Sequence, residues 1–335
     1  QPMIITRTPL RISLGGGGTD LPSYYEGAGH GFLIAAAITK YVFIAVNRNF
    51  DDDILLKYSE IERVADAESV SHPLLRECLR ATGTTHGLEV SSMADIPAGT
   101  GLGSSGAFTV GALHALRMYC HAPTDRAELA REACSIEIER LGEPVGKQDQ
   151  YIAAIGGLTS FTFHSDGTVD WERLEIDDAT RSQLEDNLLL FYTGIRRSAS
   201  SVLEHEGTGI REGSSNGGDR SGVADNLDRT RAIGYETRDA LAEGDLAGFG
   251  ELLSRQWKLK YERQPDVVNR QIDDLIGRGL AAGALGGKLV GAGGGGFLLF
   301  FADEKVKLRR EMVELGLEEV RFGIDYEGTT TLVAR

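Results

Sequence analysis

Residues 97–106 combine four glycines with three hydroxyl side chains, in the order Pro97, Ala98, Gly99, Thr100, Gly101, Leu102, Gly103, Ser104, Ser105, Gly106. Glycine lets the backbone turn with positive φ and bring its N–H groups close to an anion. The apolar-periodic segment 108–119 predicts a helix directly afterwards, and a helix start offers unpaired amides and a positive dipole end. The two serines add hydroxyls for phosphate or for a phosphate-bound Mg²⁺. This segment, the glycine loop, therefore predicts a phosphate-binding site.

Glu137 is a second candidate for chemistry, because it interrupts an apolar helix face. Asp125 with a glutamate three residues later predicts a helix over 125–141. The face that carries Glu137 otherwise holds Ala130, Cys134 and Leu141. A carboxylate in apolar surroundings is costly unless it is paired or bound to a metal. Glu137 is thus a candidate metal ligand, and a helical ion pair with Arg140 or Arg131 is the alternative.

The composition narrows the classes of ligand. A formal net charge of −15 repels nucleic acid and anionic membrane surfaces, so we expect neither as a partner. An anionic substrate then requires a local basic pocket. The longest early apolar run, 32–46, is broken by Lys40 and is too short to span a bilayer. Three cysteines without metal-ligand spacing predict a reduced, cytoplasmic protein.

The elements that must position these residues follow an α+β pattern. Hydrophobic periodicity predicts strands at 3–14, 31–38, 42–50, 54–58, 88–93, 158–163, 169–176, 188–193 and 297–301, with two short strands at the end. It predicts helices at 73–81, 108–119, 125–141, 151–155, 226–242, 245–258, 267–280 and 304–315. Residues 204–222 are rich in Gly, Ser and charge, which predicts a surface loop. The length of 335 residues favours two domains that share a cleft, and we divide them as 1–180 and 181–335.

Familiar phosphate motifs fit these glycines poorly. The spacing of Gly101, Gly103 and Gly106 matches the dinucleotide fingerprint, with Asp125 as its ribose-binding acid. That fingerprint normally opens the first βαβ unit, whereas this loop follows antiparallel-looking strands, so an oxidoreductase is a distant alternative. Residues 283–288 superficially resemble a P-loop, but Leu289 stands where Ser or Thr is required. The sequence contains no His-Arg-Asp or Asp-Phe-Gly of the protein-kinase type.

Three glycine clusters in order resemble those of the GHMP small-molecule kinases. The first is Pro9-Leu10-Arg11 with the glycines 15–18, the second is the glycine loop, and the third is 288–297. The second motif of that family usually ends in Ser-Ser-Ala, and this chain has Gly106 in the last place, a change that we expect to leave the loop undisturbed. The resemblance covers nearly the whole chain. It implies a two-domain GHMP kinase fold with the active site in the cleft between the domains.

The resemblance also implies roles for single residues. The glycine loop would wrap the phosphates of ATP, with Ser104 and Glu137 as ligands of Mg²⁺. Asp149 matches the catalytic carboxylate, which accepts the proton of the acceptor hydroxyl as that oxygen attacks the γ-phosphorus. Arg11 matches the basic residue beside it. The alternatives are a helix cap for Asp149 and a structural salt bridge for Arg11.

The acceptor is expected to be a sugar phosphate. The first and third clusters would line its site, which makes Gly17, Thr19, Asp20, Gly293 and Gly294 candidate substrate-binding residues. The amino-acid sequences of the first cluster, of 148–151 and of 291–297 are similar to those of the D-glycero-D-manno-heptose 7-phosphate kinases. Those enzymes phosphorylate the anomeric hydroxyl to give a 1,7-bisphosphate. Basic candidates for the 7-phosphate are Arg196 and Arg197, together with Lys258 and Lys260 on the predicted helix 245–258 and just after it. Each could instead be a solvated surface charge.

Other interpretations stay open at this stage. A kinase of the same family for an unphosphorylated sugar or an octose phosphate would share much of this spelling. A non-catalytic ligand sensor on the same fold could lose Asp149, Ser104 or Glu137, and this chain retains all three. A homo-oligomer is compatible with the sequence, which does not indicate the number of subunits.

Overall fold

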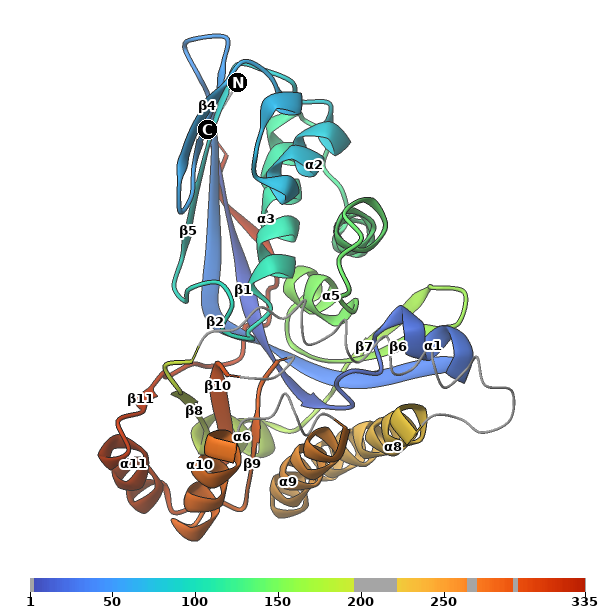
Figure 1. Cartoon of the computed structure of the whole chain (residues 1–335), viewed down its shortest axis with the longest axis vertical. Helices are drawn as coiled ribbons and strands as arrows, with labels where there is room; N and C mark the ends of the chain where they lie inside the picture. The colour runs from blue at the N-terminus through green and yellow to red at the C-terminus, as the bar shows by residue number, and fades with distance from the viewer. Residues whose placement is uncertain (1–2, 196–221, 264–269, 292–294, 335) are drawn as a thin grey trace.

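The chain folds around two β-sheets in a computed structural model that describes residues 3–195, 222–263, 270–291 and 295–334. The large sheet contains β1 (Ile4–Gly15), β2 (His30–Arg48), β3 (Ile54–Lys57), β4 (Ile61–Val64), β5 (Leu88–Ala94), β6 (Leu158–His164), β7 (Val169–Arg173) and β12 (Thr330–Ala334). Its order is β12-β1-β2-β5-β3-β4, and β6 and β7 extend it from β2 (Figure 1). The small sheet contains β8 (Leu188–Tyr192), β9 (Gly286–Leu289), β10 (Phe297–Phe301) and β11 (Glu318–Glu319), in the order β11-β8-β10-β9.

Helices cover both sheets (Figure 1). The described helices of the first half are α1 (Pro22–Ala28), α2 (Pro73–Thr82), α3 (Ser104–Tyr119), α4 (Arg126–Cys134), α5 (Gln148–Ile155) and α6 (Asp178–Asn187). Those of the second half are α8 (Gly222–Glu243), α9 (Leu246–Arg263), α10 (Arg270–Ala281) and α11 (Lys305–Glu314). Two short segments complete the list: the 3₁₀ turn η1 (Ala67–Ser69) and the π-helix η2 (Ser135–Arg140). The α+β class expected from the sequence is confirmed.

The central helix α3 positions the glycine loop. It packs against β1 and β2 and is buried on most sides, because small and branched apolar residues fill its surface: Ala107, Val110, Ala112, Leu113, Ala115 and Leu116. Its first turn follows Gly103, whose φ of 74° lies in the left-handed region where glycine costs least. No side chain caps this end of the helix. The first amides of α3 are therefore left without a side-chain acceptor.

The structure changes three of the expected elements. Residues 31–38 and 42–50 were predicted as two strands but form the single strand β2, because a register shift opposite Pro9 and Leu10 absorbs the extra residues. The helix predicted over 125–141 turns into a π-helix from Ser135, and Asp125 caps its start through the N–H of Glu128. Helices α1 and α6 were not predicted. Residues 204–221 of the expected surface loop lie outside the described residues.

One apolar core joins the two halves of the chain. It contains Leu10 of β1, Ile34 of β2 and Leu113 of α3, together with Leu227 of α8 and Phe249 of α9. The last strand, β12, pairs with β1 at the edge of the large sheet. The division at residue 180 stays a prediction. No helix of the described residues is long and apolar enough to cross a membrane.

Candidate active site

A cavity of about 780 Å³ lies where the glycine loop, the start of α5 and strand β9 come together. Its lining includes both predicted catalytic residues, both predicted metal ligands and part of the glycine loop: Arg11, Asp149, Ser104, Glu137, Gly99, Gly101, Gly103 and Ser105. Residues of α9 and β9 line it as well. The two halves of the chain therefore contribute to one cavity.

Arg11 and Asp149 form a two-pronged ion pair in this cavity. Nε and Nη2 of Arg11 donate to the two carboxylate oxygens of Asp149 at 2.7 and 3.0 Å. Nη1 of Arg11 donates to the carbonyl oxygen of Gly101 at 2.6 Å. Arg11 is 5% exposed, whereas the Asp149 side chain is 25% exposed. The guanidinium thus fixes the carboxylate against the glycine loop and leaves one side of it open to the cavity.

Asp149 does not cap α5, because it lies in the first turn of that helix and Lys147 is the N-cap. Gly106 packs directly behind it. A Cβ on Gly106 would lie 2.8 Å from Cβ of Asp149 and 3.0 Å from the backbone N of Gln150. The glycine in the last place of the second motif therefore lets α3 approach the start of α5 closely.

Two described glycines of the third cluster, Gly291 and Gly296, pack against the glycine loop. A Cβ on Gly291 would lie 2.5 Å from the carbonyl oxygen of Gly101, and one on Gly296 would lie 2.1 Å from that of Thr100. Gly291 and Gly296 have φ values of 82° and 101°. The two clusters thus meet backbone to backbone, which side chains would prevent.

Four members of the glycine loop lie away from the cavity lining. Leu102 is fully buried, and the Thr100 hydroxyl donates to the carbonyl oxygen of Pro97 at 3.0 Å. Gly106 faces Asp149, as described above. These residues shape the loop, while the glycines 99, 101 and 103 and the two serines face the cavity.

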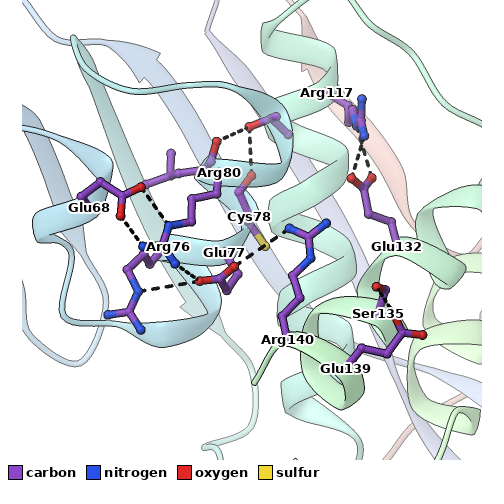
Figure 2. Close-up of polar contacts among 12 residues, drawn as sticks. Glu68, Arg76, Glu77, Cys78, Arg80, Arg117, Glu132, Ser135, Glu139 and Arg140 are labelled. Carbon is purple, nitrogen blue, oxygen red and sulfur yellow. Dashed lines mark hydrogen bonds and ion pairs between the residues drawn. The ribbon is translucent and has the colours of Figure 1, made fainter. Parts of the chain in front are cut away.

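Glu137 is buried, at 1% exposure, in the π-helix η2. Ser105 Oγ donates to its Oε2 at 2.6 Å, and Gln150 Nε2 donates to its Oε1 at 3.0 Å. Burial raises the pKa of Glu137, and hydrogen bonds from these neighbours oppose the rise. The arginines proposed as alternative partners turn elsewhere: Arg140 points to Glu77 of α2 (Figure 2), and Arg131 pairs with Glu128.

Ser104 and Glu137 together fit a divalent cation that arrives with a nucleotide. Both line the cavity, and a buried carboxylate held by two neutral donors gains from a nearby positive charge. Among the described residues, no group of three or more His, Cys, Asp or Glu could hold a metal. The remaining ligands of such a cation would therefore come from phosphate oxygens and water.

Asp20 is a buried carboxylate close enough to Asp149 and Arg11 to be affected by their charges. Its oxygens accept hydrogen bonds from the backbone N–H groups of Gly18 and Gln148, both at 3.2 Å. Burial, and then the charge of Asp149, raise the pKa of Asp20 to about 6. Of the other acceptor-side candidates, Gly17 lines the cavity, whereas the Thr19 hydroxyl is fully buried among backbone groups of Gly16 and Phe32.

Of the basic residues predicted for the 7-phosphate of the acceptor, Lys258 and Lys260 are among the described residues, and only Lys260 lines the cavity. Lys258 is exposed on α9 and is absent from the cavity lining. Arg196, Arg197, Gly293 and Gly294 lie outside the described residues. The cations that do line the cavity besides Arg11 are Lys260, Arg263 and Lys288. Arg263 was not predicted for this site, and Lys288 was included only as the first residue of the third cluster, 288–297, not as a phosphate-binding cation.

Part of the cavity lining is aromatic and apolar. It consists of Tyr58, His72 and Phe108, with Leu74, Met93 and Ile96. The rings of His72 and Phe108 stack at a centroid distance of 5.1 Å, and burial lowers the pKa of His72. A neutral imidazole beside a phenyl ring offers a surface for a flat ligand.

Comparisons with known proteins agree with this geometry. Residues 70–157 match the GHMP kinases N terminal domain, and residues 237–316 match the GHMP kinases C terminal domain. Together the two matches cover half of the chain. The chain belongs to the GHMP kinase family. It is a phosphotransferase by family, and the expected two-domain GHMP kinase fold is confirmed.

Named relatives of this GHMP kinase are sugar and sugar-phosphate kinases. The chain is 29% identical over 319 residues to a D-glycero-alpha-D-manno-heptose 7-phosphate kinase of Campylobacter jejuni, which covers 91% of each protein. It is 25% identical over 329 residues to a galactokinase of Pyrococcus furiosus, over 90% of this chain and 89% of that enzyme. A solved D-glycero-D-manno-heptose 1-phosphate kinase of Bacteroides thetaiotaomicron shares the fold, with a TM-score of 0.78, 23% identity and coverage of 98% and 99%.

Proposed function

We propose that this GHMP kinase transfers the γ-phosphoryl group of ATP to the anomeric hydroxyl of a heptose 7-phosphate. The observation that carries the proposal is the paired Arg11 and Asp149 beside the glycine loop. Asp149 would accept the proton of the acceptor hydroxyl as that oxygen attacks phosphorus. Arg11 would orient the carboxylate and add positive charge beside the moving phosphoryl group. Positioning and charge neutralisation would supply most of the rate.

The proposal that ATP binds here rests on the start of α3 and on the aromatic residues of the cavity lining. The uncapped first turn of α3 and the glycines before it suit the β- and γ-phosphates. The surface formed by Tyr58, His72 and Phe108 suits the adenine ring. Both features border the same cavity as the catalytic pair.

Ser104 and Glu137 would hold Mg²⁺ on the bound nucleotide. When bound, this ion neutralises charge on the β- and γ-phosphates. Ser105 and Gln150 would orient the carboxylate of Glu137, since both donate to it. Gln150 follows Asp149 in the first turn of α5, so one helix start supports both carboxylates.

The acceptor side is proposed from similarity and from charge. The heptose 7-phosphate kinase of Campylobacter jejuni matches over 91% of its length, and cations from α9 and β9 line the cavity, as a phosphorylated sugar requires. The galactokinases among the relatives favour an unphosphorylated sugar as the second candidate.

A panel of acceptors tests the proposal. The protein is incubated with ATP, Mg²⁺ and, in turn, heptose 7-phosphate, the free heptose, galactose and an octose phosphate, and ADP release is measured. We expect turnover with heptose 7-phosphate and a new anomeric phosphate signal in ³¹P NMR. Faster turnover with an unphosphorylated sugar would favour the second candidate. Absence of ADP release with every acceptor would overturn the proposal.

A further inference from the structure

Lys288 is a cavity cation to which the proposed function gives no individual role. It lies on β9, is 6% exposed and lines the cavity. Its ammonium donates to Oε1 of Gln256 at 3.1 Å, which is a neutral partner. Burial, and then the positive charges of Lys260 and Arg11, lower the pKa of Lys288 to about 7. An ammonium in such surroundings is costly, and a bound anion offsets the cost.

Ser13 adds an unpartnered hydroxyl to the same wall. It lies two residues after Arg11 on β1, so the two side chains share one face of the strand. Ser13 is 6% exposed and lines the cavity, and its Oγ has no hydrogen-bond partner in the described part of the chain. A buried hydroxyl without a protein partner indicates room for a polar ligand group.

Gln256 links the lysine to the strand that carries this serine. Its Nε2 donates to the carbonyl oxygen of Leu14 at 2.7 Å, while its Oε1 accepts from Lys288. The glutamine is buried, at 7% exposure. It therefore acts as a positioning residue, because it links the ammonium of Lys288 to the Leu14–Gly15 peptide, next to Ser13 in the chain.

Cations dominate the charged groups around Lys288. Lys260 comes from α9, lines the cavity and donates to the carbonyl oxygen of Gly291. Arg11 comes from β1, and its charge is shared with Asp149. Strand β10 places the apolar Leu299 opposite Lys288 in the ladder. The charges that act on Lys288 are therefore mainly positive, although the formal net charge of the whole chain is −15.

We propose that Lys288, Lys260 and Ser13 form a phosphate-binding subsite of the cavity, separate from the amides at the start of α3. This inference rests on the proposed function, which supplies two candidate phosphates. They are the 7-phosphate of the acceptor sugar and the γ-phosphate of ATP. An uncharged lysine binds a phosphate dianion only after protonation. Binding of the phosphate that occupies this subsite should therefore take up part of a proton near pH 7.5.

Isothermal titration calorimetry in two buffers of different ionisation enthalpy measures both affinity and proton uptake. The ligands are heptose 7-phosphate, the free heptose and the Mg²⁺ complex of a non-hydrolysable ATP analogue. The variants are Lys288→Met, Lys288→Arg and Ser13→Ala, and Lys307→Met on α11 is the control. Lys307 is exposed and donates to the carbonyl oxygen of Ala281, so its loss removes one positive charge of the same half of the chain.

For wild type we expect proton uptake with one of the two phosphate ligands. Lys288→Met should weaken that ligand at least tenfold and abolish the uptake. Lys288→Arg should keep most of the affinity but not the uptake, because arginine is already charged. Ser13→Ala should weaken the same ligand severalfold, and Lys307→Met should leave both ligands within twofold of wild type. Thermal unfolding of each variant checks that it is folded.

The ligand affected identifies the source of the phosphate. Loss confined to heptose 7-phosphate, with the free heptose unchanged, assigns the subsite to the acceptor. Loss confined to the ATP analogue assigns it to the γ-phosphate. The inference is overturned if Lys288→Met binds both phosphate ligands within twofold of wild type. Failure of the proposed function is a separate result, since it appears as absent ADP release with every acceptor, whereas calorimetry measures the binding of each phosphate ligand without turnover.

Discussion

Arg11 and Asp149 are 138 positions apart in the sequence, yet they meet through two hydrogen bonds. Their contact depends on the absence of a side chain at Gly103 of the glycine loop, since a Cβ there would lie 3.0 Å from Cγ of Arg11 and 3.2 Å from Cγ of Asp149. The geometry of this proposed catalytic pair therefore depends on single side chains at single positions. Substitutions of one or two atoms are the appropriate tests.

Asp149→Asn should abolish most turnover and leave nucleotide binding intact. Asparagine retains an oxygen for Arg11 but cannot accept the proton of the acceptor hydroxyl. Loss of a general base typically costs about 10²–10⁴ in rate, so we expect kcat to fall by that order. The affinity for the ATP analogue should stay within about twofold, as measured by calorimetry.

The matched control for that variant is Asp170→Asn. Asp170 lies exposed on β7, where it pairs with His164, and its loss should leave kcat unchanged. If Asp149→Asn instead lost its affinity for the ATP analogue while kcat with saturating ATP survived, Asp149 would be a structural residue of the nucleotide site.

Asp20→Asn should stabilise the protein at neutral pH. The pKa of Asp20 is raised from 3.8 to about 6, so the folded state favours the protonated form. The stability that this group contributes is present in full below about pH 4 and is lost as pH rises through about 6. The difference in pKa corresponds to about 3 kcal/mol. Asparagine stays neutral, so the variant should exceed wild type most at pH 7.5.

Urea unfolding of both proteins from pH 4 to 7.5 measures this difference. We expect the gap in free energy of unfolding to shrink as pH falls toward 4. A gap that stays constant with pH would show that Asp20 does not titrate in this range. The same variant should raise KM for the acceptor, because Asp20 lines the cavity. A substitution that increases stability at a binding site commonly lowers function there.

At the level of elements, the junction between α3 and α5 sets the position of Asp149. Gly106→Ala tests it, because the added Cβ would lie 2.8 Å from Cβ of Asp149 and one helix must move. Overpacking of this kind costs about 1–3 kcal/mol. We expect a lower melting temperature and a lower kcat, measured by calorimetric unfolding and by ADP release.

Gly277→Ala in α10 is the control for that substitution. A Cβ there meets no atom within 4 Å, so alanine should stabilise the exposed helix by up to about 1 kcal/mol. If Gly106→Ala were as active and stable as wild type, the family's usual alanine would be interchangeable here and other contacts would fix α5.

The helical spacing of α9 explains why Lys260 lines the cavity and Lys258 does not. The buried stripe of this helix is Phe249, Leu253, Gln256 and Trp257, and residues three or four apart share a face. Counting along that stripe selects Lys260 for the cavity and turns Lys258 to solvent. Both lysines follow Trp257 within three residues, so their place in the sequence alone does not distinguish them. Their positions around the helix do.

The role of Lys288 was not predictable for a different reason. It opens the third cluster, but Leu289 after it excludes a P-loop lysine, and the sequence indicates no other phosphate contact for it. Its burial depends on β9 pairing with β10 and on α9 covering that strand, which no local pattern reveals. Glu137, by contrast, was found from the sequence, since a single carboxylate interrupted an apolar stripe. The strands and helices near the glycine loop were predictable because their periodicity is strong, whereas short α1 and α6 were not.

At the scale of the whole molecule, β12 pairs the end of the chain with its first strand, β1. β12 pairs with β1 from Ile4 opposite Ala334 to Arg7 opposite Thr330, and the core that includes Leu10 continues into Leu227 and Phe249. The threonine-rich end of the chain carries no sign of this partner. The predicted division at residue 180 follows a change in composition, and only the folded structure links the two sides of it.

A fragment of residues 1–180 should therefore not fold by itself. It would lack β12, which leaves an edge of β1 unpaired, and it would expose apolar core residues that α8 and α9 cover. We expect aggregation or a non-cooperative thermal transition by circular dichroism. Residues 181–335 supplied by co-expression should restore a soluble complex, in which the cavity lined by both halves binds the ATP analogue. A soluble, monomeric 1–180 fragment that unfolds cooperatively would instead establish an independent first domain, and the shared core would then contribute to domain docking rather than to folding.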